Sequence, residues 1–205
     1  MLYWLVVPLA WLVWHIGFRI KVIGRENLIK NRGFVMVCNH ISAIDPVFLV
    51  ISRFWGQRMI VLGKKELFKN FFGGFFLRHC GVVAVDRGKG DSTVIDDTIE
   101  RVKNGQGCLV FPEGTRTKDG NLQKLKSGAF VIAQMAGVDI LPVRIIFKGG
   151  KMKIFGEVTV VFGEPITTAL LGLEEKEHTA SALRGAKAIV TEKLENMLEE
   201  NREYL

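Results

Sequence analysis

Short apolar runs alternate with amphipathic segments along most of this chain. The runs are rich in β-branched residues and are bounded by glycine, proline or polar turns, which is typical of buried strands. Helical spacing of apolar residues lies between several of them. This alternation predicts one α/β domain with a mostly parallel or mixed sheet of about seven strands flanked by helices. The predicted strands are 20–23, 33–38, 58–62, 82–85, 107–111, 140–147 and 153–162, and the predicted helices are 46–54, 66–78, 91–104 and 127–136.

The N-terminal segment departs from this pattern. Residues 2–18 are apolar except for one histidine, and basic residues follow them. The run is at the short limit for a membrane span, and its tryptophans Trp4, Trp11 and Trp14 favour the headgroup zone. No basic region precedes it, which argues against a signal peptide. We expect residues 1–18 to form a membrane-associating anchor embedded in or lying along the membrane, with a full span or a buried core helix as alternatives.

The C-terminal segment, 174–205, is predicted to be an amphipathic helix packed on a central domain of residues 19–173. Its apolar residues recur at helical steps. They are Leu183, Ala186, Val190, Leu194 and Met197.

Charge is unevenly distributed along the chain. The formal net charge is +7, and residues 174–205 hold eight Glu against five Lys or Arg, a net of −3, so residues 1–173 carry +10. This basic excess suits an anionic membrane surface or anionic substrates. Nucleic acid would suit it too, but no nucleic-acid-binding module is recognisable, and we expect no nucleic-acid partner.

The three cysteines Cys38, Cys80 and Cys108 are odd in number and lie in or beside apolar segments. Their spacing matches no zinc pattern, so no metal site is expected. We interpret them as reduced thiols of a cytosol-facing protein.

His40 and Asp45 are the first candidates for chemistry. They follow the apolar run 34–38, and the end of a buried strand is where α/β proteins place catalytic groups. Histidine exchanges protons near neutral pH, and a carboxylate can fix its tautomer. Because no nucleophile-elbow pattern adjoins them, a base acting directly on a substrate hydroxyl is favoured. Alternatively, Asp45 before Pro46 is the N-cap of a helix and His40 a turn residue.

A second polar turn follows another predicted strand. Residues 111–116 read Phe-Pro-Glu-Gly-Thr-Arg. Pro112 ends the strand and Gly114 permits a tight turn. Arg116 is a natural ligand for phosphate, because guanidinium binds its oxygens bidentately. The alternative is a surface turn containing a Glu–Arg pair.

Together these turns resemble the glycerolipid acyltransferase family. The family pattern is Asn-His-x-x-x-x-Asp followed about seventy residues later by Phe-Pro-Glu-Gly-Thr-Arg. Further blocks lie in the family order over about residues 20–165, with conservative departures at Gly63 and Leu125. These blocks are Gly63-Lys64-Lys65-Glu66-Leu67, the block 81–87 ending in Asp86-Arg87, Leu125-Lys126-Ser127-Gly128-Ala129, and Leu141-Pro142-Val143.

The resemblance is strongest to bacterial 1-acylglycerol-3-phosphate acyltransferases, and it implies an enzyme of phospholipid biosynthesis. The acceptor would be lysophosphatidic acid and the donor acyl-CoA or acyl carrier protein, with no further cofactor. His40 would be the base and Asp45 its partner. The resemblance also implies a substrate-binding set, namely Lys64, Arg87, Glu113, Gly114, Thr115 and Arg116. The backbone N–H groups of Gly114 and Thr115 are expected to face the developing oxyanion.

Two alternative functions remain open at this point. A sibling acyltransferase would use glycerol 3-phosphate or another lysophospholipid. A non-catalytic basic module would bind membrane or nucleic acid, but binding alone requires no His40/Asp45 pair. For the enzyme we expect the cytoplasmic face of the cell membrane, reached through residues 1–18 and a phenylalanine–lysine patch at 64–78.

Overall fold

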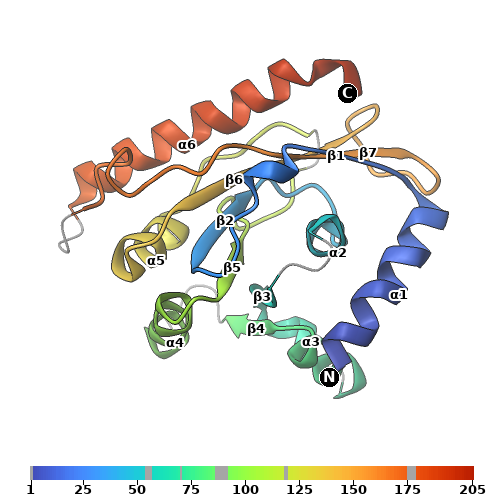
Figure 1. The fold of residues 1–205 in the computed structure, drawn as a ribbon, viewed down its shortest axis with the longest axis horizontal. Helices are drawn as coiled ribbons and strands as arrows, with labels where there is room; N and C mark the ends of the chain where they lie inside the picture. Colours follow the sequence, from blue (N-terminus) through green and yellow to red (C-terminus); the bar gives the residue numbers. More distant parts are fainter. Residues whose placement is uncertain (1, 54–56, 70, 86–91, 118–119, 175–178) are drawn as a thin grey trace.

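The computed structural model describes residues 2–53, 57–69, 71–85, 92–117, 120–174 and 179–205. In this part of the chain, strands and helices alternate as the apolar pattern predicts (Figure 1). The strands are β1 Arg19–Ile23, β2 Phe34–Cys38, β3 Met59–Lys64, β4 Val82–Val85, β5 Gly107–Val110, β6 Ile140–Phe147 and β7 Glu157–Phe162. The helices are α1 Leu2–Gly17, α2 Asp45–Ser52, α3 Phe71–His79, α4 Ser92–Lys103, α5 Gly128–Ala136 and α6 Ala180–Glu200.

The strands form one seven-stranded sheet in the order β1-β7-β6-β2-β5-β3-β4. Every neighbouring pair is parallel except β6 and β7, which are antiparallel. The prediction of a mostly parallel or mixed sheet is therefore confirmed. Because β2 to β6 all run the same way, their carboxyl ends share one edge of the sheet, where α/β proteins bind ligands.

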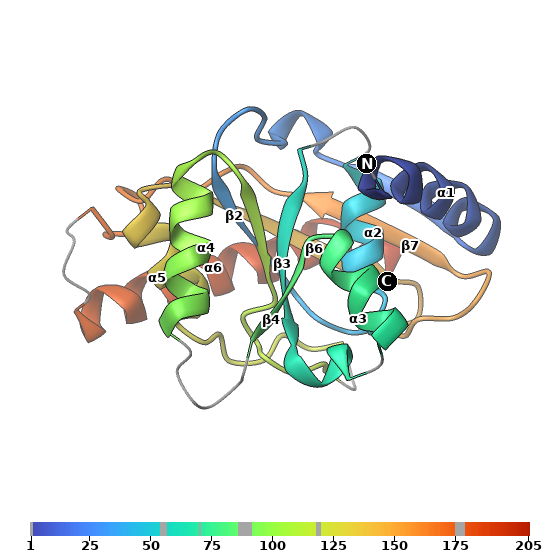
Figure 2. The ribbon, with the colours of Figure 1, turned by 90° about the horizontal axis from the view of Figure 1, so that it is seen from below.

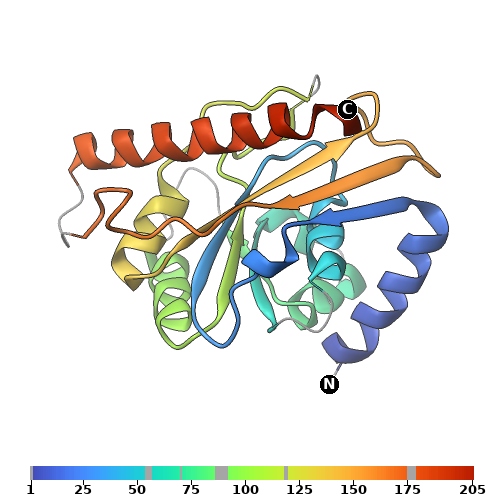
Figure 3. The ribbon, with the colours of Figure 1, turned by 45° about the horizontal axis from the view of Figure 1, so that its top comes forward.

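Two apolar layers cover the two faces of the sheet. On one face, α4, α5 and α6 pack over β2, β5 and β6 through residues such as Phe130 and Val190. On the other face, α2 and the inner side of α1 pack through residues such as Phe48. Figure 2 shows α1 beside α2, and Figure 3 shows α6 running along β6. Burial of both faces explains why β2 is apolar throughout and β6 is apolar except for the buried Arg144, with no alternation of polar and apolar positions.

The C-terminal helix packs through the stripe that its sequence predicts. Ala186, Val190, Leu194 and Met197 are buried in α6, and Leu183 packs against the same core. Thr179 caps the helix, with its side-chain oxygen accepting from the Ala182 N–H at 3.1 Å.

The N-terminal helix is only half covered. Ala10, Trp11 and Trp14 pack against the core layer of α2. The opposite side exposes large apolar side chains, so α1 is neither a core helix nor an ordinary amphipathic surface helix. None of the described helices combines the length and apolarity that a membrane span requires. The exposed residues of α1 are Trp4, Leu5, Leu9, Leu12, Val13 and Ile16.

Three local predictions require correction. The strand predicted over 153–162 begins only at Glu157, because Phe155 has a positive φ of 61° and ends a loop. The segment 66–78 divides into a 3-10 turn at Lys65–Phe68 and helix α3. Asp45 is not an N-cap. The N-cap of α2 is Ile44, and the carboxylate of Asp45 bonds the turn before the helix.

Candidate active site

The two polar turns of the sequence meet at the carboxyl edge of the sheet. The His40 turn follows β2 and the Glu113 turn follows β5, and these strands are parallel neighbours with Val37 opposite Val110. The backbone N–H of Thr117 donates to the carbonyl of His40 at 2.8 Å. Two segments about seventy residues apart in sequence therefore form one site.

His40 and Asp45 form a buried hydrogen-bonded pair. His40 Nδ1 lies 2.9 Å from Asp45 Oδ2, and the Asp45 side chain has no exposed surface. Because an ionised carboxylate can only accept, this contact selects the neutral tautomer with the proton on Nδ1 and the lone pair on Nε2. The pair therefore presents His40 Nε2 as a proton acceptor, as a base acting on a hydroxyl requires.

The same carboxylate oxygen organises the turn around the pair. Asp45 Oδ2 also accepts the backbone N–H groups of Ile41 at 2.7 Å and Ser42 at 2.8 Å. Three donors converge on one oxygen, which fixes the position of Asp45 against the turn that bears His40. These bonds replace part of the water shell of the buried carboxylate, while no described residue bonds its second oxygen, Oδ1.

Asn39 anchors the turn to the sheet, and sequence analysis assigned it no role. Its side-chain Nδ2 donates to the Ile145 carbonyl at 3.0 Å, and its Oδ1 accepts the Ile145 N–H at 2.8 Å. The side-chain amide thus continues the β2–β6 ladder one step past Cys38. The chain can turn away from the sheet there without leaving the buried Ile145 backbone unpaired.

Glu113 is buried beneath the two turns rather than facing substrate. Its Oε1 accepts the His40 N–H at 2.7 Å, and its Oε2 accepts the Gln123 N–H at 2.9 Å. Burial raises the pKa of this carboxyl, and these two hydrogen bonds and the charge of buried Arg144 oppose the rise. Glu113 therefore positions the His40 backbone. It does not form the Glu–Arg pair on a surface turn that was the alternative prediction for this segment.

Phe111 completes the packing of the histidine. The rings of His40 and Phe111 stack with their centroids 4.1 Å apart. The imidazole is therefore held by Asp45 at one edge and by an aromatic face, and only 14% of its side chain is exposed. Such restraint reduces the orientational freedom that a base would otherwise lose on reaction.

The other predicted substrate-binding residues divide into three groups. Thr115 and Arg116 are exposed on the turn after β5, so they face outward as a ligand for phosphate must. Lys64 ends β3 and is paired with Glu66 at 3.2 Å. Arg87 lies outside the described residues.

Gly114 requires a correction to its predicted donor role. Its backbone N–H donates to the Phe111 carbonyl at 3.1 Å, so it is engaged inside the turn and does not face an oxyanion. What the position needs is glycine itself, because its φ is 75° and a Cβ there would lie 2.5 Å from Lys126 Nζ.

Lys126 belongs to the family-like block of residues 125–129, and the sequence predicted no separate role for it. The fold brings its ammonium over Gly114, and its backbone N–H donates to the Pro112 carbonyl at 2.8 Å. A second cation therefore lies beside the exposed Arg116 turn. Only the tertiary fold reveals this proximity, because Lys126 follows Gly114 by twelve positions in the sequence.

The cysteines offer no alternative nucleophile. All three are free thiols, and Cys38 and Cys108 are fully buried. Burial raises the pKa of Cys108 to about 12, so this thiol stays protonated and inert at neutral pH. Within the described ranges, no group of three or more His, Cys, Asp or Glu side chains is placed to hold a metal ion.

Comparison with known proteins agrees with this geometry. The sequence model of the Acyltransferase family matches residues 19–146, which include both turns and Lys126. This chain belongs to the Acyltransferase family. This acyltransferase is 33% identical over 190 residues to the 1-acyl-sn-glycerol-3-phosphate acyltransferase of Bacillus subtilis, covering 88% of this chain and 90% of that protein.

Two further similarities extend the comparison. A protein of the same name from Borreliella burgdorferi is 29% identical over 186 residues, covering 84% of this chain and 71% of that protein. Among solved structures, PlsC from Thermotoga maritima, described as a 1-acyl-sn-glycerophosphate (LPA) acyltransferase, superposes with a TM-score of 0.70 at 25% identity. The match covers 95% of this acyltransferase and 79% of the Thermotoga chain, so the shared architecture spans nearly all of this chain.

Proposed function

We propose that this acyltransferase moves a fatty acyl group from an acyl thioester to the sn-2 hydroxyl of 1-acylglycerol 3-phosphate, giving phosphatidic acid. Relatives in Bacillus subtilis and Borreliella burgdorferi, whose names state this acceptor class, support the proposal. The observation that carries it is the buried His40–Asp45 bond of 2.9 Å, which presents Nε2 as a base.

The reaction we propose proceeds without a covalent enzyme intermediate. His40 Nε2 takes the proton of the sn-2 hydroxyl, and the oxygen attacks the thioester carbonyl. The tetrahedral intermediate collapses with cleavage of the C–S bond, and the thiolate receives the proton from His40. Asp45 stabilises the imidazolium while the proton is held. Proton and electrons balance, so no cofactor is needed beyond the acyl-CoA or acyl carrier protein donor.

The acceptor phosphate is assigned to the cations around the second turn. Arg116 is exposed there, and Lys126 lies over Gly114 on the same turn. Lys64 is a third candidate. Its ammonium would release the Glu66 carboxylate, 3.2 Å away, and bind the phosphate in its place. A phosphate with two negative charges is better matched by several cations than by one, because each charge-assisted contact adds to its affinity. Glu113 does not join this set, since both its oxygens bond backbone N–H groups.

We further propose that the protein works at the cytoplasmic face of the cell membrane, where its acceptor lipid resides. The exposed apolar side of α1 supports this location, since large exposed apolar patches are rare on soluble monomers. Exposed Leu67 and Phe75 add apolar surface in the 64–78 segment. Three free thiols fit a reducing compartment.

An acceptor panel tests the proposed function. Purified protein is incubated with oleoyl-CoA and with lysophosphatidic acid, glycerol 3-phosphate or lysophosphatidylcholine, and products are identified by mass spectrometry. We expect phosphatidic acid to form fastest. Faster acylation of glycerol 3-phosphate would assign the sibling activity, and no turnover of any acceptor with either donor class would contradict the proposal. Oleoyl-acyl carrier protein in a parallel series identifies the preferred donor.

A further inference from the structure

The loop between β6 and β7 projects from the same sheet edge as His40. β6 is parallel to β2, so the connection that follows its carboxyl end, Lys148–Gly156, lies at that edge. The first half of the loop also adjoins the segment that follows the Arg116 turn, because a Cβ at Gly120 would lie 3.3 Å from the Gly150 carbonyl oxygen. The loop and His40 therefore share one edge of the sheet.

The tip of this loop exposes two large apolar side chains. Ile154 is 71% exposed and Phe155 is 69% exposed. Phe155 also has φ 61°, a left-handed conformation that is uncommon for residues other than glycine and asparagine. Its N–H donates to the Gly17 carbonyl at 2.7 Å, which holds the strained backbone against the end of α1. A strained aromatic presented to solvent is unfavourable for folding, which points to a use outside the fold.

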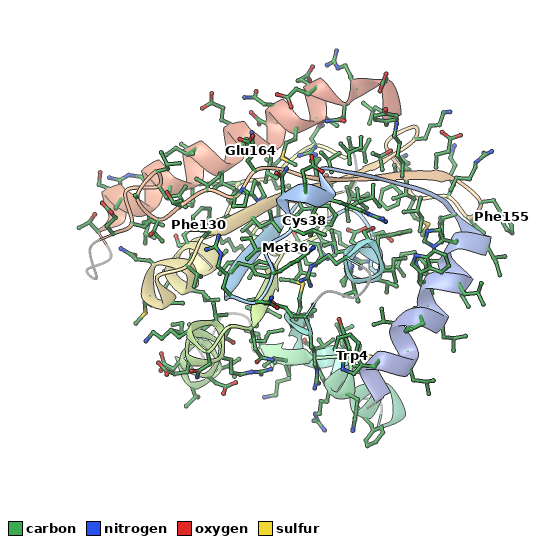
Figure 4. All side chains as sticks on the ribbon, in the orientation of Figure 1. Trp4, Met36, Cys38, Phe130, Phe155 and Glu164 are labelled. Atoms are coloured by element: carbon green, nitrogen blue, oxygen red, sulfur yellow. The ribbon has the colours of Figure 1, made fainter. Side chains whose placement is uncertain are left out.

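The tip continues the exposed apolar side of α1. Ile16, 70% exposed, is at the end of this helix, and it lines one hollow of about 290 Å³ together with Phe155. Figure 4 shows Phe155 at the outer rim beside the end of α1 and Trp4 near its beginning. The helix is 16 residues long, or about 24 Å at 1.5 Å per residue, so the combined apolar surface is long and shallow.

Basic side chains surround this apolar tip. The stretch Lys148–Gly156 contains three lysines and no acidic residue, and Lys151 and Lys153 are exposed. Arg19, at the start of β1, is 76% exposed and lies 3.5 Å from Glu157. Apolar side chains ringed by lysine and arginine are complementary to the acyl chains and anionic headgroups of a bilayer.

We propose that Ile154 and Phe155 insert into an anionic bilayer as a further contact beside α1, with Lys151 and Lys153 at the lipid phosphates. This inference rests on the membrane location in the proposed function, and it adds the residues that orient the catalytic edge toward the lipid. An acidic carrier protein would also meet lysines and apolar groups. The bilayer is favoured because the tip is continuous with an extended apolar helix face rather than with a closed pocket.

The first test exploits the strain at Phe155. In Phe155→Gly, the left-handed backbone becomes unstrained, so we expect the melting temperature to stay equal or rise. Binding of the full chain to phosphatidylglycerol vesicles should fall about tenfold, since burial of a large apolar side chain is worth at least that factor. Ile189→Ser, at an exposed apolar position on α6, is the matched control and should keep wild-type binding. Unchanged vesicle binding of Phe155→Gly would overturn the proposal.

The second test measures insertion directly. In a Cys80→Ser background, where the remaining Cys38 and Cys108 are buried, a fluorophore is attached at Ile154→Cys or at the distant Ser181→Cys on α6. With phosphatidylglycerol vesicles, brominated acyl chains should quench the label at 154 and leave the label at 181 unaffected. Accessibility of both labels to aqueous iodide would overturn insertion, as would a response at 154 only to acyl carrier protein.

The same labels separate this inference from the proposed chemistry. His40→Ala in the labelled protein should abolish turnover and leave quenching at 154 intact. Turnover without quenching would refute the insertion while the enzyme assignment stands. Quenching without turnover of any acceptor by the unmutated protein would refute the enzyme assignment while the insertion stands.

Discussion

The turns after β2 and after β5 are built in opposite ways, although both carry a buried carboxylate at a strand end. In the first turn, Asn39 bonds to the sheet and Asp45 bonds within the turn, while the His40 side chain is 14% exposed. In the second, Glu113 bonds inward while Thr115 and Arg116 stay exposed. The first turn therefore restrains an imidazole, and the second leaves a cation exposed.

This difference separates residues that position His40 from residues that we expect to bind the acceptor. Residues that bond inward should affect turnover or stability when they are changed, because the geometry around His40 depends on them. Residues that remain exposed should affect acceptor binding with little effect on the fold. The following predictions test that separation.

Asp45→Ala should have the largest effect among these variants. It removes the acceptor of three donors, so we expect kcat to fall about 100-fold or more together with a loss of stability. Asp45→Asn is the matched control, since its oxygen can still accept backbone N–H groups while the charge is gone. Steady-state kinetics and thermal melts of both variants measure the two effects. Full turnover in Asp45→Asn would show that the charge is dispensable.

Arg116→Ala should weaken acceptor binding by about 1.5–3 kcal/mol, the value of a hydrogen bond to a charged group, with the melting temperature unchanged. Arg116→Lys should restore only part of the loss, because ammonium lacks the bidentate fork. Kinetics with acceptor and donor varied separately measure this. A defect confined to the acyl donor would move Arg116 to the donor side and break the assignment.

Asn39→Ala should destabilise the fold by about 2–3 kcal/mol, because it leaves the buried Ile145 N–H and carbonyl without partners. Chemical denaturation measures this change. Asn196→Ala on the exposed side of α6 is the control and should stay within about 0.5 kcal/mol of wild type. Equal stability of the two variants would mean that the Asn39 bridge does not hold the turn.

Glu113→Gln should change the pH dependence of stability by a small amount. Burial raises the pKa of Glu113 in the fold, so its contribution to stability is fully present below the unfolded pKa and declines as pH rises through the folded pKa. The variant lacks this decline. The stability difference, wild type minus variant, should therefore shrink as pH rises above about 4.3, the ordinary pKa of glutamate, in paired thermal melts. A difference that grows with pH would give Glu113 a lowered pKa instead.

Much of the fold could be predicted from the sequence, for identifiable reasons. β2 and β6 are buried on both faces, so their apolar runs are unambiguous. The stripe of α6 has one clear helical face. By contrast, Ile154 and Phe155 look like strand residues, but the left-handed φ of Phe155 and its bond to Gly17 place them in a loop. Isoleucine and phenylalanine favour β-strands, but the contact with Gly17 at the end of α1 overrides that preference here.

The fold brings three of the predicted site residues together, but their bonding could not be predicted from the sequence. His40, Asp45 and Glu113 stand out as polar groups at strand ends. Their partners do not, because a hydrogen bond from Asn39 to Ile145 crosses more than one hundred residues and leaves no local signal. Asp45 before Pro46 has the signature of an N-cap. In the fold, however, its carboxylate bonds His40 and the backbone of the His40 turn instead of capping the helix.

The turnover of His40→Ala tests the central claim most directly. We expect kcat to fall at least about 100-fold with lysophosphatidic acid and oleoyl-CoA, while circular dichroism and the melting temperature show an intact fold. Asp45 and Glu113 remain in this variant, so only the base is lost. A rate near that of wild type would contradict the assignment of His40 and with it the proposed mechanism.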